Sequence, residues 1–326
     1  MVAGRGQNKK MVHGAQDSML RTWLSEQYPS SYTDGRRCDE IGYLQCKLIL
    51  KPDRFTSAHV FKEFAALVQR AAEKTGVGYR HTPKSLQRPE VREVLFLDTG
   101  AYHLYNNSFI VRRRIAYQDG FPIDDPEIVF KYRSENMEKA QALDVRPRID
   151  GKYKIKFKLE VMPLKDRIGG MRRLLSHNVE FGLSQAPQAS RLVMASLGYM
   201  TMAELGQIFP ALQTIVLQGA DEVSMVNQTV VEELMQDICE LSFHHHTAAT
   251  ANLALWRSRG DHHGFVGEFA FQLRFTGPAD IRSESLAACE AFFIELQQVA
   301  ANWLTLTSTK TGAVYRLKGN PPQAHE

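Results

Sequence analysis

The sequence predicts an α+β fold in which a closed antiparallel β-barrel, a tunnel of about eight strands, carries helices packed outside it. Short runs of alternating polar and apolar residues, separated by turn residues, recur along the chain and are typical of strands. Two segments, 57–72 and 283–304, have broad apolar faces that need a sheet to bury them. Few of the predicted strands are joined through regular helices, which favours antiparallel pairing.

Composition and length are those of a globular protein. Of 326 residues, 44% are hydrophobic and 23% are charged, which excludes an intrinsically disordered chain. We predict a flexible basic N-terminal tail over residues 1–36 and a single barrel domain over 37–326. Within the tail, an apolar patch can dock as a short helix; it consists of Met19, Leu20, Trp23 and Leu24. No apolar run reaches the ~18 residues of a membrane span, so no membrane partner is expected.

The cysteines and the N-terminus predict a cytoplasmic protein. The four cysteines are Cys38, Cys46, Cys239 and Cys289, and no two of them have the CxxC spacing. Free thiols in a reducing compartment are therefore favoured over disulfides or a zinc site. The first ten residues are basic but lack the apolar core of a secretory signal. The net charge of +4 does not by itself indicate a nucleic-acid partner.

Five strands and one helix are predicted in the first half of the chain. The first strand ends at Pro52, and Thr56 or Ser57 then caps the helix over 57–72, which Gly76 closes. The strands are 41–51, 91–97, 109–115, 127–133 and 152–161, with turns at Asn106-Asn107 and at Gly120 and Pro122.

The second half is predicted to be less regular. Segments 167–176 and 189–197 are expected to be helical, and 212–243 is ambiguous, with strand-like stretches at 214–217 and 237–243. The remaining elements are a hairpin of 252–257 with 268–275 around a loop at 260–264, the helix 283–304, and a final strand at 313–317.

Basic side chains dominate the polar faces of these strands when each is read at period two. Nine cations share these faces: Lys47, Arg112, Arg114, Lys131, Arg133, Lys154, Lys156, Lys158 and Arg274. The carboxylates on the same faces are Glu127, Glu160 and Glu268. Arg113 lies on the opposite face of its strand, and Gln45 and Gln272 add neutral polar groups.

Two interpretations of these polar faces stay open. An amphipathic strand usually turns its polar face to solvent, and this is the simpler explanation for any one strand. Alternatively, the helices cover the apolar faces and the polar faces line the inside of a closed barrel. Cations gathered in a tunnel repel one another and imply a polyanionic ligand. A phosphate chain suits the planar fork of arginine and the point charge of lysine.

One block of the sequence resembles the CYTH, or triphosphate tunnel metalloenzyme, superfamily. Its residues are Phe96-Leu97-Asp98-Thr99, the spacer His103-Leu104-Tyr105-Asn106-Asn107, and the strand Phe109-Ile110-Val111-Arg112-Arg113-Arg114. The segment 128–131, with Lys131, looks like the next strand of that family, and 267–271 looks like its late acidic strand. The resemblance covers roughly residues 41–317, with the specific part in 91–133.

The resemblance implies a tunnel that binds a triphosphate, with glutamates holding Mg²⁺ or Mn²⁺ for phosphoryl transfer. By this resemblance the catalytic phosphate contacts are Lys47, Arg112, Arg114 and Lys131. Further substrate contacts on the same polar faces are Arg133, Lys154, Lys156, Lys158 and Arg274. Glu268 is the metal ligand that the resemblance implies, and Glu160, or alternatively Glu127, is expected to help it hold the metal.

The sequence departs from the family at its acidic positions. The family has Glu-x-Glu-x-Lys on the first strand, whereas this chain has Tyr43 and Gln45 before Lys47, and Ala270 replaces a partner of Glu268. The resemblance favours one hypothesis, a divalent-metal-dependent triphosphatase, whereas the missing acidic residues favour another. A non-catalytic binding module for a nucleotide or polyphosphate is the other, and an RNA 5′-triphosphate ligand is less favoured. The histidines at 244–246 and 262–263 are interpreted as residues of surface loops and not as metal ligands.

Overall fold

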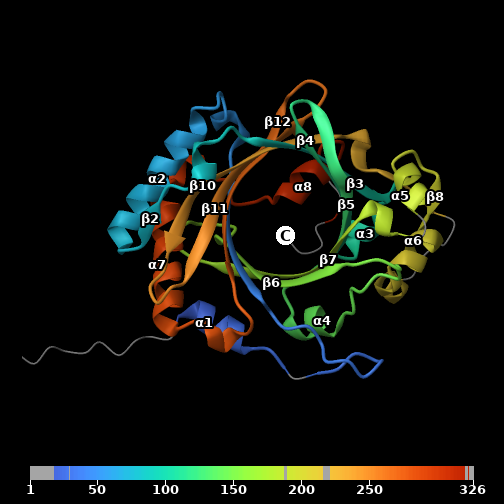
Figure 1. Cartoon of the computed structure of the whole chain (residues 1–326), viewed down its shortest axis with the longest axis horizontal. Coiled ribbons are helices and arrows are strands. Elements are labelled where there is room, and N and C mark those ends of the chain that lie inside the picture. The colour runs from blue at the N-terminus through green and yellow to red at the C-terminus, as the bar shows by residue number, and fades with distance from the viewer. Residues whose placement is uncertain (1–17, 29, 187–188, 216–220, 320–321, 323–326) are drawn as a thin grey trace, which may run out of the picture.

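The strands of the protein close into a barrel (Figure 1). The computed structural model describes residues 18–28, 30–186, 189–215, 221–319 and 322. The order around the barrel is β10-β11-β12-β1-β6-β7-β5-β4-β3, and pairing of β3 with β10 closes it. The nine strands are β1 (Tyr43–Leu50), β3 (Glu90–Thr99), β4 (Phe109–Gln118), β5 (Phe121–Ser134), β6 (Lys154–Met162), β7 (Arg172–Gly182), β10 (Val231–Ser242), β11 (Ala248–Ser258) and β12 (Gly264–Arg274). The predicted closed barrel is confirmed, with nine strands where about eight were expected.

One neighbouring pair departs from the predicted antiparallel arrangement. β1 runs parallel to β6, with Tyr43 opposite Lys158, and antiparallel to β12, with Tyr43 opposite Arg274. The other barrel pairs are antiparallel. Three short strands extend the sheet outside the barrel: β2 (Gly78–Arg80), β8 (Met200–Thr201) and β9 (Glu222–Met225).

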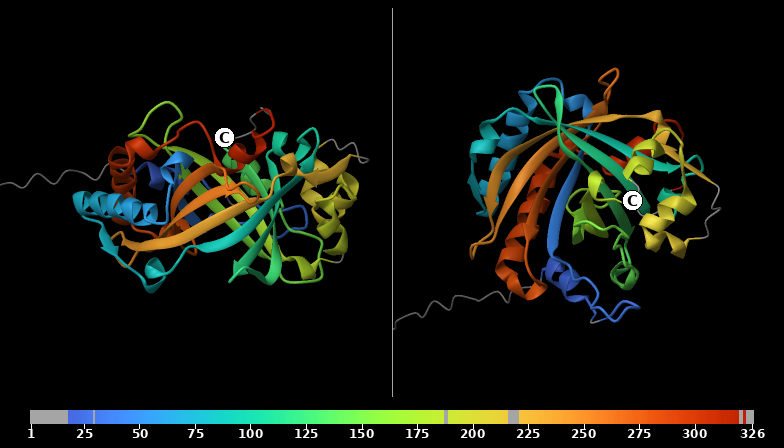
Figure 2. Two further views of the ribbon diagram at one scale, coloured as in Figure 1. Left: turned by 90° about the horizontal axis from the view of Figure 1, so that it is seen from above. Right: turned by 45° about the vertical axis from the view of Figure 1, so that its right-hand side comes forward.

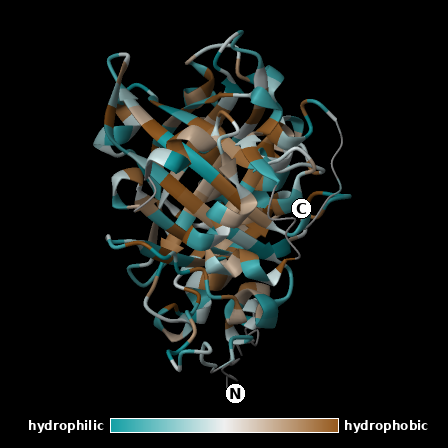
Figure 3. Ribbon diagram, turned by 90° about the vertical axis from the view of Figure 1, so that its right-hand side faces the viewer, coloured by the Kyte–Doolittle hydropathy of each residue, from teal (hydrophilic) through white to brown (hydrophobic). Residues whose placement is uncertain are grey.

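Helices cover the apolar outer faces of the barrel on two sides (Figure 2). On one side lie α1 (Met19–Ser25), α2 (Val60–Thr75) and α7 (Ser283–Val299), and on the other α5 (Ala189–Ala195) and α6 (Met202–Ile208). The remaining helices are α3 (His103–Asn106), α4 (Met137–Ala142) and α8 (Lys310–Tyr315). Hydrophilic and hydrophobic residues alternate in bands along the strands (Figure 3), as a wall with two different faces requires.

Each outer face has its own hydrophobic core. Phe64 of α2 packs on Phe269 of β12 with ring centroids 5.4 Å apart, and both rings are fully buried. On the other side, Phe130 of β5 stacks on Phe209 with centroids 4.4 Å apart. The apolar side chains of the strands therefore point outward to the helices, and the polar side chains at alternate positions point inward.

A third apolar cluster fills one end of the barrel interior. It contains Ile49, Val94 and Phe96, which share strand faces with the inward-pointing polar residues, together with Tyr315 of α8. In Figure 1, α8 lies within the outline of the barrel. Three backbone N–H groups of β3 and α3 donate to the Asp98 carboxylate and fix it. The Tyr315 hydroxyl donates to the same carboxylate at 3.1 Å, which ties α8 to β3.

Two elements were predicted wrongly. The segment 167–176 was expected to be helical, but β7 begins at Arg172. Its side chains from Leu174 to Asn178 are buried on both faces of the strand, so polar and apolar residues do not alternate there. The segment 313–317 was expected to be a strand, but α8 begins after Thr309, whose side chain accepts from the Gly312 N–H.

Several other predictions fall at the edges of the described residues. The apolar patch of the predicted tail forms α1, and Leu20 and Leu24 are fully buried, so packed structure begins inside 1–36. Residues 1–17 lie outside the described residues. The strand-like stretch 214–217 lies partly outside them, and its first residue, Thr214, is the last residue of a 3₁₀ helix, Pro210–Thr214.

The four cysteines are free and buried. Among the described residues, no helix is both long and apolar enough to span a bilayer.

Candidate functional site

A charged cavity of about 170 Å³ lies inside the barrel. All nine barrel strands contribute inward-pointing side chains to it, and α8 adds two more. The lining residues are Gln45, Lys47, Arg92, Arg112, Arg114, Lys131, Arg133, Lys156, Lys158, Asn178, Glu180, Glu233, Met235, Asn252, Trp256, Glu268, Lys310 and Thr311. Nine of them are Lys or Arg and three are Glu, so the lining has a large positive excess. This favours the interior interpretation of the polar faces over the solvent interpretation.

On one wall of the cavity, a single carboxylate is shared by three cations; we call this group the Glu160 centre. Glu160 Oε1 lies 2.8 Å from Lys47 Nζ and 3.1 Å from Lys131 Nζ, and Glu160 Oε2 lies 3.7 Å from Arg133 Nη2. Burial would raise the pKa of Glu160, but the neighbouring charges of Lys131, Lys47 and Arg133 outweigh it and hold that pKa well below its usual range. Burial lowers the pKa of Lys131 well below normal in spite of Glu160.

On β10 and β12, two carboxylates share one lysine; we call this group the Lys310 centre. Lys310 Nζ lies 2.8 Å from Glu268 Oε1 and 3.1 Å from Glu233 Oε1. Glu233 also pairs with Arg92 at 2.8 Å and accepts a hydrogen bond from Trp256 Nε1 at 2.8 Å. Burial opposes ionisation of Glu233, but Lys310 and Arg92 lower its pKa far below the usual value.

Two further cations of the cavity, Arg112 and Lys158, form no ion pair with a carboxylate of the described residues. Arg112 on β4 has a buried Nε without a hydrogen-bond partner, and no ion pair within 4.0 Å joins it to a carboxylate of the described residues. Burial, followed by repulsion from Arg114, lowers the pKa of Arg112 to about 10. Lys158 donates to Gln272 at 2.9 Å and to Gln45 at 3.4 Å, both neutral groups. Burial and then repulsion from Lys47 lower the pKa of Lys158 to about 7.

The rest of the cavity is more nearly neutralised. Glu180 of β7 pairs with Lys156 and lies 3.8 Å from Arg114 Nη2, and Arg114 also pairs with Glu127. Glu180 has a lowered pKa because these cations outweigh its burial.

Seven of the nine cations predicted from the strand faces line the cavity. Lys154 and Arg274 do not; both are exposed at strand ends, and the Arg274 guanidinium lies 5.9 Å from the centroid of the Tyr43 ring. Gln45 lines the cavity, and Ala270 is buried opposite Lys47 in the β1–β12 register.

Five important cavity residues were missed: Arg92, Glu180, Glu233, Trp256 and Lys310. Arg92 lies on the predicted strand 91–97, where alternation at period two distinguishes it from its apolar neighbours Val91 and Val94 only weakly. Glu180 lies just beyond a segment predicted as helical, and Glu233 lies in the ambiguous region. Lys310 reaches the cavity only because α8 enters the barrel end, which no local pattern indicates.

The residues present do not fit a resident metal ion. The two predicted ligands, Glu160 and Glu268, belong to different centres, and each is held by lysine. The described residues include no group of three or more His, Cys, Asp or Glu placed to hold a metal ion. Mg²⁺ prefers hard oxygen ligands, and ammonium groups engage both carboxylates here. The expected Mg²⁺ or Mn²⁺ stays a prediction from the sequence resemblance.

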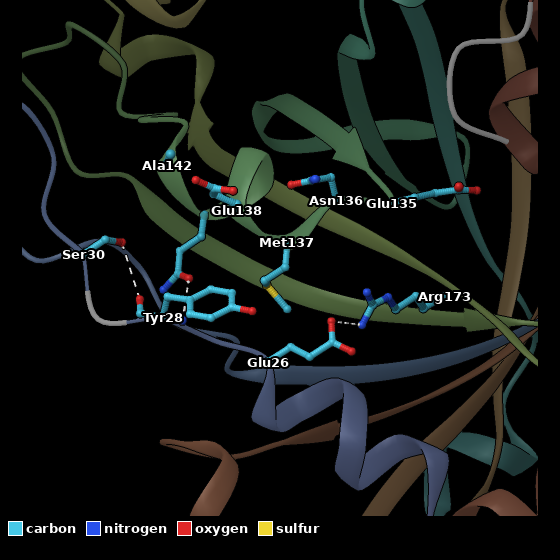
Figure 4. A pocket seen from close by; sticks show the side chains of 10 residues that line it. Glu26, Tyr28, Ser30, Glu135, Asn136, Met137, Glu138, Ala142 and Arg173 are labelled. Carbon is cyan, nitrogen blue, oxygen red and sulfur yellow. Dashed lines mark hydrogen bonds and ion pairs between the residues drawn. The ribbon is translucent and has the colours of Figure 1, made fainter.

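A larger cavity, of about 750 Å³, lies outside the barrel wall (Figure 4). It is lined by the segment after α1, by α4 and by Arg173 of β7, which pairs with Glu26. It contains none of the predicted site residues, and its three glutamates face a single arginine. Of these two cavities, only the one inside the barrel is rich in cations.

No protein-family model matches the sequence, and no curated protein is similar to it. Solved structures are similar to the chain at low identity. HpAC1 from Hippeastrum, described as an adenylyl cyclase with a dominant triphosphatase activity, is 14% identical with a TM-score of 0.39, over 88% of this chain and 100% of that one. A protein of Bacillus halodurans described as an adenylate cyclase is 10% identical with a TM-score of 0.36, over 83% and 97%. The Pct1 RNA triphosphatase of S. pombe is 11% identical with a TM-score of 0.21, over 82% and 77%.

The closed barrel with a basic interior agrees with the tunnel fold that the resemblance to the CYTH superfamily implies. The two residues that replace the family's first-strand glutamates both contact Lys158. Tyr43 is buried, with Lys158 Nζ 5.6 Å from its ring centroid, and Gln45 accepts a hydrogen bond from the same lysine. Because similar folds carry different activities, we base the functional proposal on the cavity itself.

Proposed function

We propose that the cavity binds the phosphate chain of a triphosphate- or polyphosphate-bearing ligand. The observation that carries this proposal is Arg112, a half-buried arginine that lines the cavity, has a buried Nε without a hydrogen-bond partner, and forms no ion pair within 4.0 Å with a carboxylate of the described residues. Holding a largely desolvated cation without a close counter-charge costs stability, unless a ligand supplies that charge. Arginine presents two parallel N–H donors that match phosphate oxygens.

The charge excess favours a chain of phosphates over one phosphate. Nine cations line the cavity, and five carboxylates oppose them: the three of the lining, and Glu160 and Glu127, which pair with lining cations. A single phosphate group carries only about −1.5 to −2 at neutral pH, so more than one phosphate is needed to offset the remaining excess. The volume of about 170 Å³ is below the ~300 Å³ typical of sites for whole drug-sized ligands. The phosphate chain would therefore lie inside, with any base or sugar at the mouth.

Metal-dependent hydrolysis is the second candidate function, and the sequence resemblance favours it. Lysines and arginines that neutralise the phosphates and hold them in line would support such a reaction. In this chain, however, the carboxylates that would hold the metal already form ion pairs, which favours binding without turnover. An RNA 5′-triphosphate would reach the same cavity and add a steep dependence on salt as the RNA lengthens.

The test is calorimetric titration with inorganic tripolyphosphate in the presence of a chelator. We expect binding to the wild type, weaker binding of pyrophosphate and orthophosphate, and a loss of at least about tenfold in Arg112→Ala. The matched control is Arg113→Ala, because Arg113 is the next residue on β4 and points away from the cavity, toward Glu93 at 3.9 Å. No binding to the wild type, or an equal loss in both variants, would overturn the proposal.

Phosphate release, assayed with Mg²⁺ or Mn²⁺, separates the two candidate functions. Binding without release supports a non-catalytic module. Metal-dependent release from tripolyphosphate or ATP that Glu268→Gln abolishes would establish the triphosphatase instead.

A further inference from the structure

Lys310 occupies an unusual position among the cavity lysines, between two carboxylates from different strands. Glu233 is on β10 and Glu268 is on β12, and β11 separates these strands. The ammonium lies 3.1 Å from Glu233 Oε1 and 2.8 Å from Glu268 Oε1. Without a cation between them, the two carboxylates would repel each other in a buried site.

The surroundings hold this ammonium in one place. Its nitrogen lies 4.7 Å from the centroid of the Trp256 ring, a cation–π contact, and the indole N–H of Trp256 binds Glu233. Lys310 is the first residue of α8, and α8 is anchored at its other end by Asn227, which donates to the Val314 carbonyl oxygen at 2.7 Å. The Tyr315 ring stacks on Tyr105 with centroids 4.1 Å apart. The lysine is therefore a fixed part of the cavity wall.

Two carboxylate oxygens that converge on one point beside a phosphate site form the kind of donor set that binds Mg²⁺ or Mn²⁺. An ammonium can take the same place, because it is positive and its three N–H groups can serve two carboxylates and one further oxygen. It carries less charge than a divalent ion, but it needs no free metal in solution.

We propose that Lys310 is the resident cation of this site: it bridges Glu233 and Glu268 in place of a divalent metal and offers its remaining N–H to a phosphate oxygen of the ligand. The phosphate part of this inference rests on the proposed function, whereas the bridging part does not. Phosphate binding is then independent of divalent metal, and removal of the Lys310 charge uncovers a metal site.

The experiment replaces Lys310 and measures binding of Mn²⁺ alone by electron paramagnetic resonance. In Lys310→Met, which keeps the length of the stem, we expect one Mn²⁺ site at least about tenfold tighter than any in the wild type. Adding Glu268→Gln to this variant should remove that site. The matched control is Lys158→Met, which removes a cavity lysine that bonds two neutral glutamines and should create no Mn²⁺ site.

Two outcomes would overturn the proposal. One is a folded Lys310→Met protein that binds no more Mn²⁺ than the wild type. The other is a wild-type protein that already binds one Mn²⁺ at a site that Glu268→Gln destroys; this measurement decides the question even if Lys310→Met does not fold.

Tripolyphosphate titration of the wild type with chelator keeps the two proposals apart. If tripolyphosphate binds but Lys310→Met gains no Mn²⁺, the role of Lys310 is wrong and the phosphate site stands. If Mn²⁺ appears in Lys310→Met but tripolyphosphate does not bind the wild type, the bridging lysine stands and the phosphate ligand is wrong.

Discussion

The Glu160 centre and the Lys310 centre are built from the same side-chain types in different proportions. One glutamate faces three cations in the first, whereas in the second two glutamates face Lys310 and Arg92. The strands of the two centres form two arcs of the closed order that meet where β1 pairs with β12, and β4, which carries Arg112, separates them on the other side. We therefore expect a polyanion to gain most binding energy at the Glu160 centre and at Arg112, where cations exceed carboxylates. It gains less at the Lys310 centre, where two carboxylates already engage the lysine.

The largest effect is expected from Glu160→Gln, which removes the only carboxylate of the first centre. Three cations, two of them buried lysines, would lose their counter-charge, and such a loss costs about 3–5 kcal/mol. Urea unfolding at pH 7 measures it. Because the folded pKa of Glu160 lies below its unfolded value, its contribution is full above the usual Glu range and is lost as the pH falls.

A control for this prediction is Glu127→Gln, whose carboxylate is 36% exposed and pairs with Arg114. It should cost no more than about 1 kcal/mol. Equal losses in the two variants would mean that the Glu160 centre has no special weight in stability.

The next largest effect distinguishes the centres by ligand affinity. Lys131→Met should lower tripolyphosphate affinity by about 10- to 100-fold, corresponding to a charge-assisted hydrogen bond of ~1.5–3 kcal/mol, with little change in unfolding free energy. Arg92→Met should show the reverse, a loss of stability with a smaller loss of affinity, because Glu233 loses a partner at 2.8 Å. Calorimetry and urea unfolding of both variants test this, and identical profiles would remove the distinction between the centres.

A smaller effect is proton uptake on binding. The pKa of Lys158 is lowered from 10.5 to about 7, so at pH 8 the free protein holds it mostly neutral. A bound anion raises that pKa, and binding should take up as much as about one proton at pH 8 and almost none at pH 5. Calorimetry in two buffers of different ionisation enthalpy measures the uptake, which Lys158→Met should reduce.

The same lysine also affects stability in a defined direction. Its folded pKa is below its unfolded pKa, so the unfolded chain binds more protons between about pH 7 and 10.5. The contribution of Lys158 therefore becomes more favourable to folding as pH rises through that window.

The smallest effects are expected outside both centres. Lys154→Ala and Arg274→Ala remove exposed cations that do not line the cavity. Each should change stability by no more than about 0.5 kcal/mol and tripolyphosphate affinity by less than about threefold. A tenfold loss of affinity in either variant would extend the binding surface past the cavity mouth.

Period-two alternation was enough to predict the barrel and most of its interior. Lys47, Arg112, Lys131 and Lys158 are inward-pointing because each lies on a strand with an apolar outer face. The method failed where burial is two-sided, as in β7 around His177, since no alternation is left to read. It also failed at Lys310, because the β-branched and aromatic composition of 313–317 favours a strand, whereas the Thr309 cap and the buried Tyr315 make it a helix.

The position of β1 has a consequence for how this chain reaches its folded state. β1 is an early strand, yet its partners are β6, in the middle of the chain, and β12, near its end, with Tyr43 opposite both Lys158 and Arg274. Such distant pairing gives a high contact order and slow folding. On a ribosome, one edge of β1 must stay unpaired until β12 has emerged, and the barrel cannot close before then. We therefore expect truncated chains that lack β12 to aggregate rather than to fold partially.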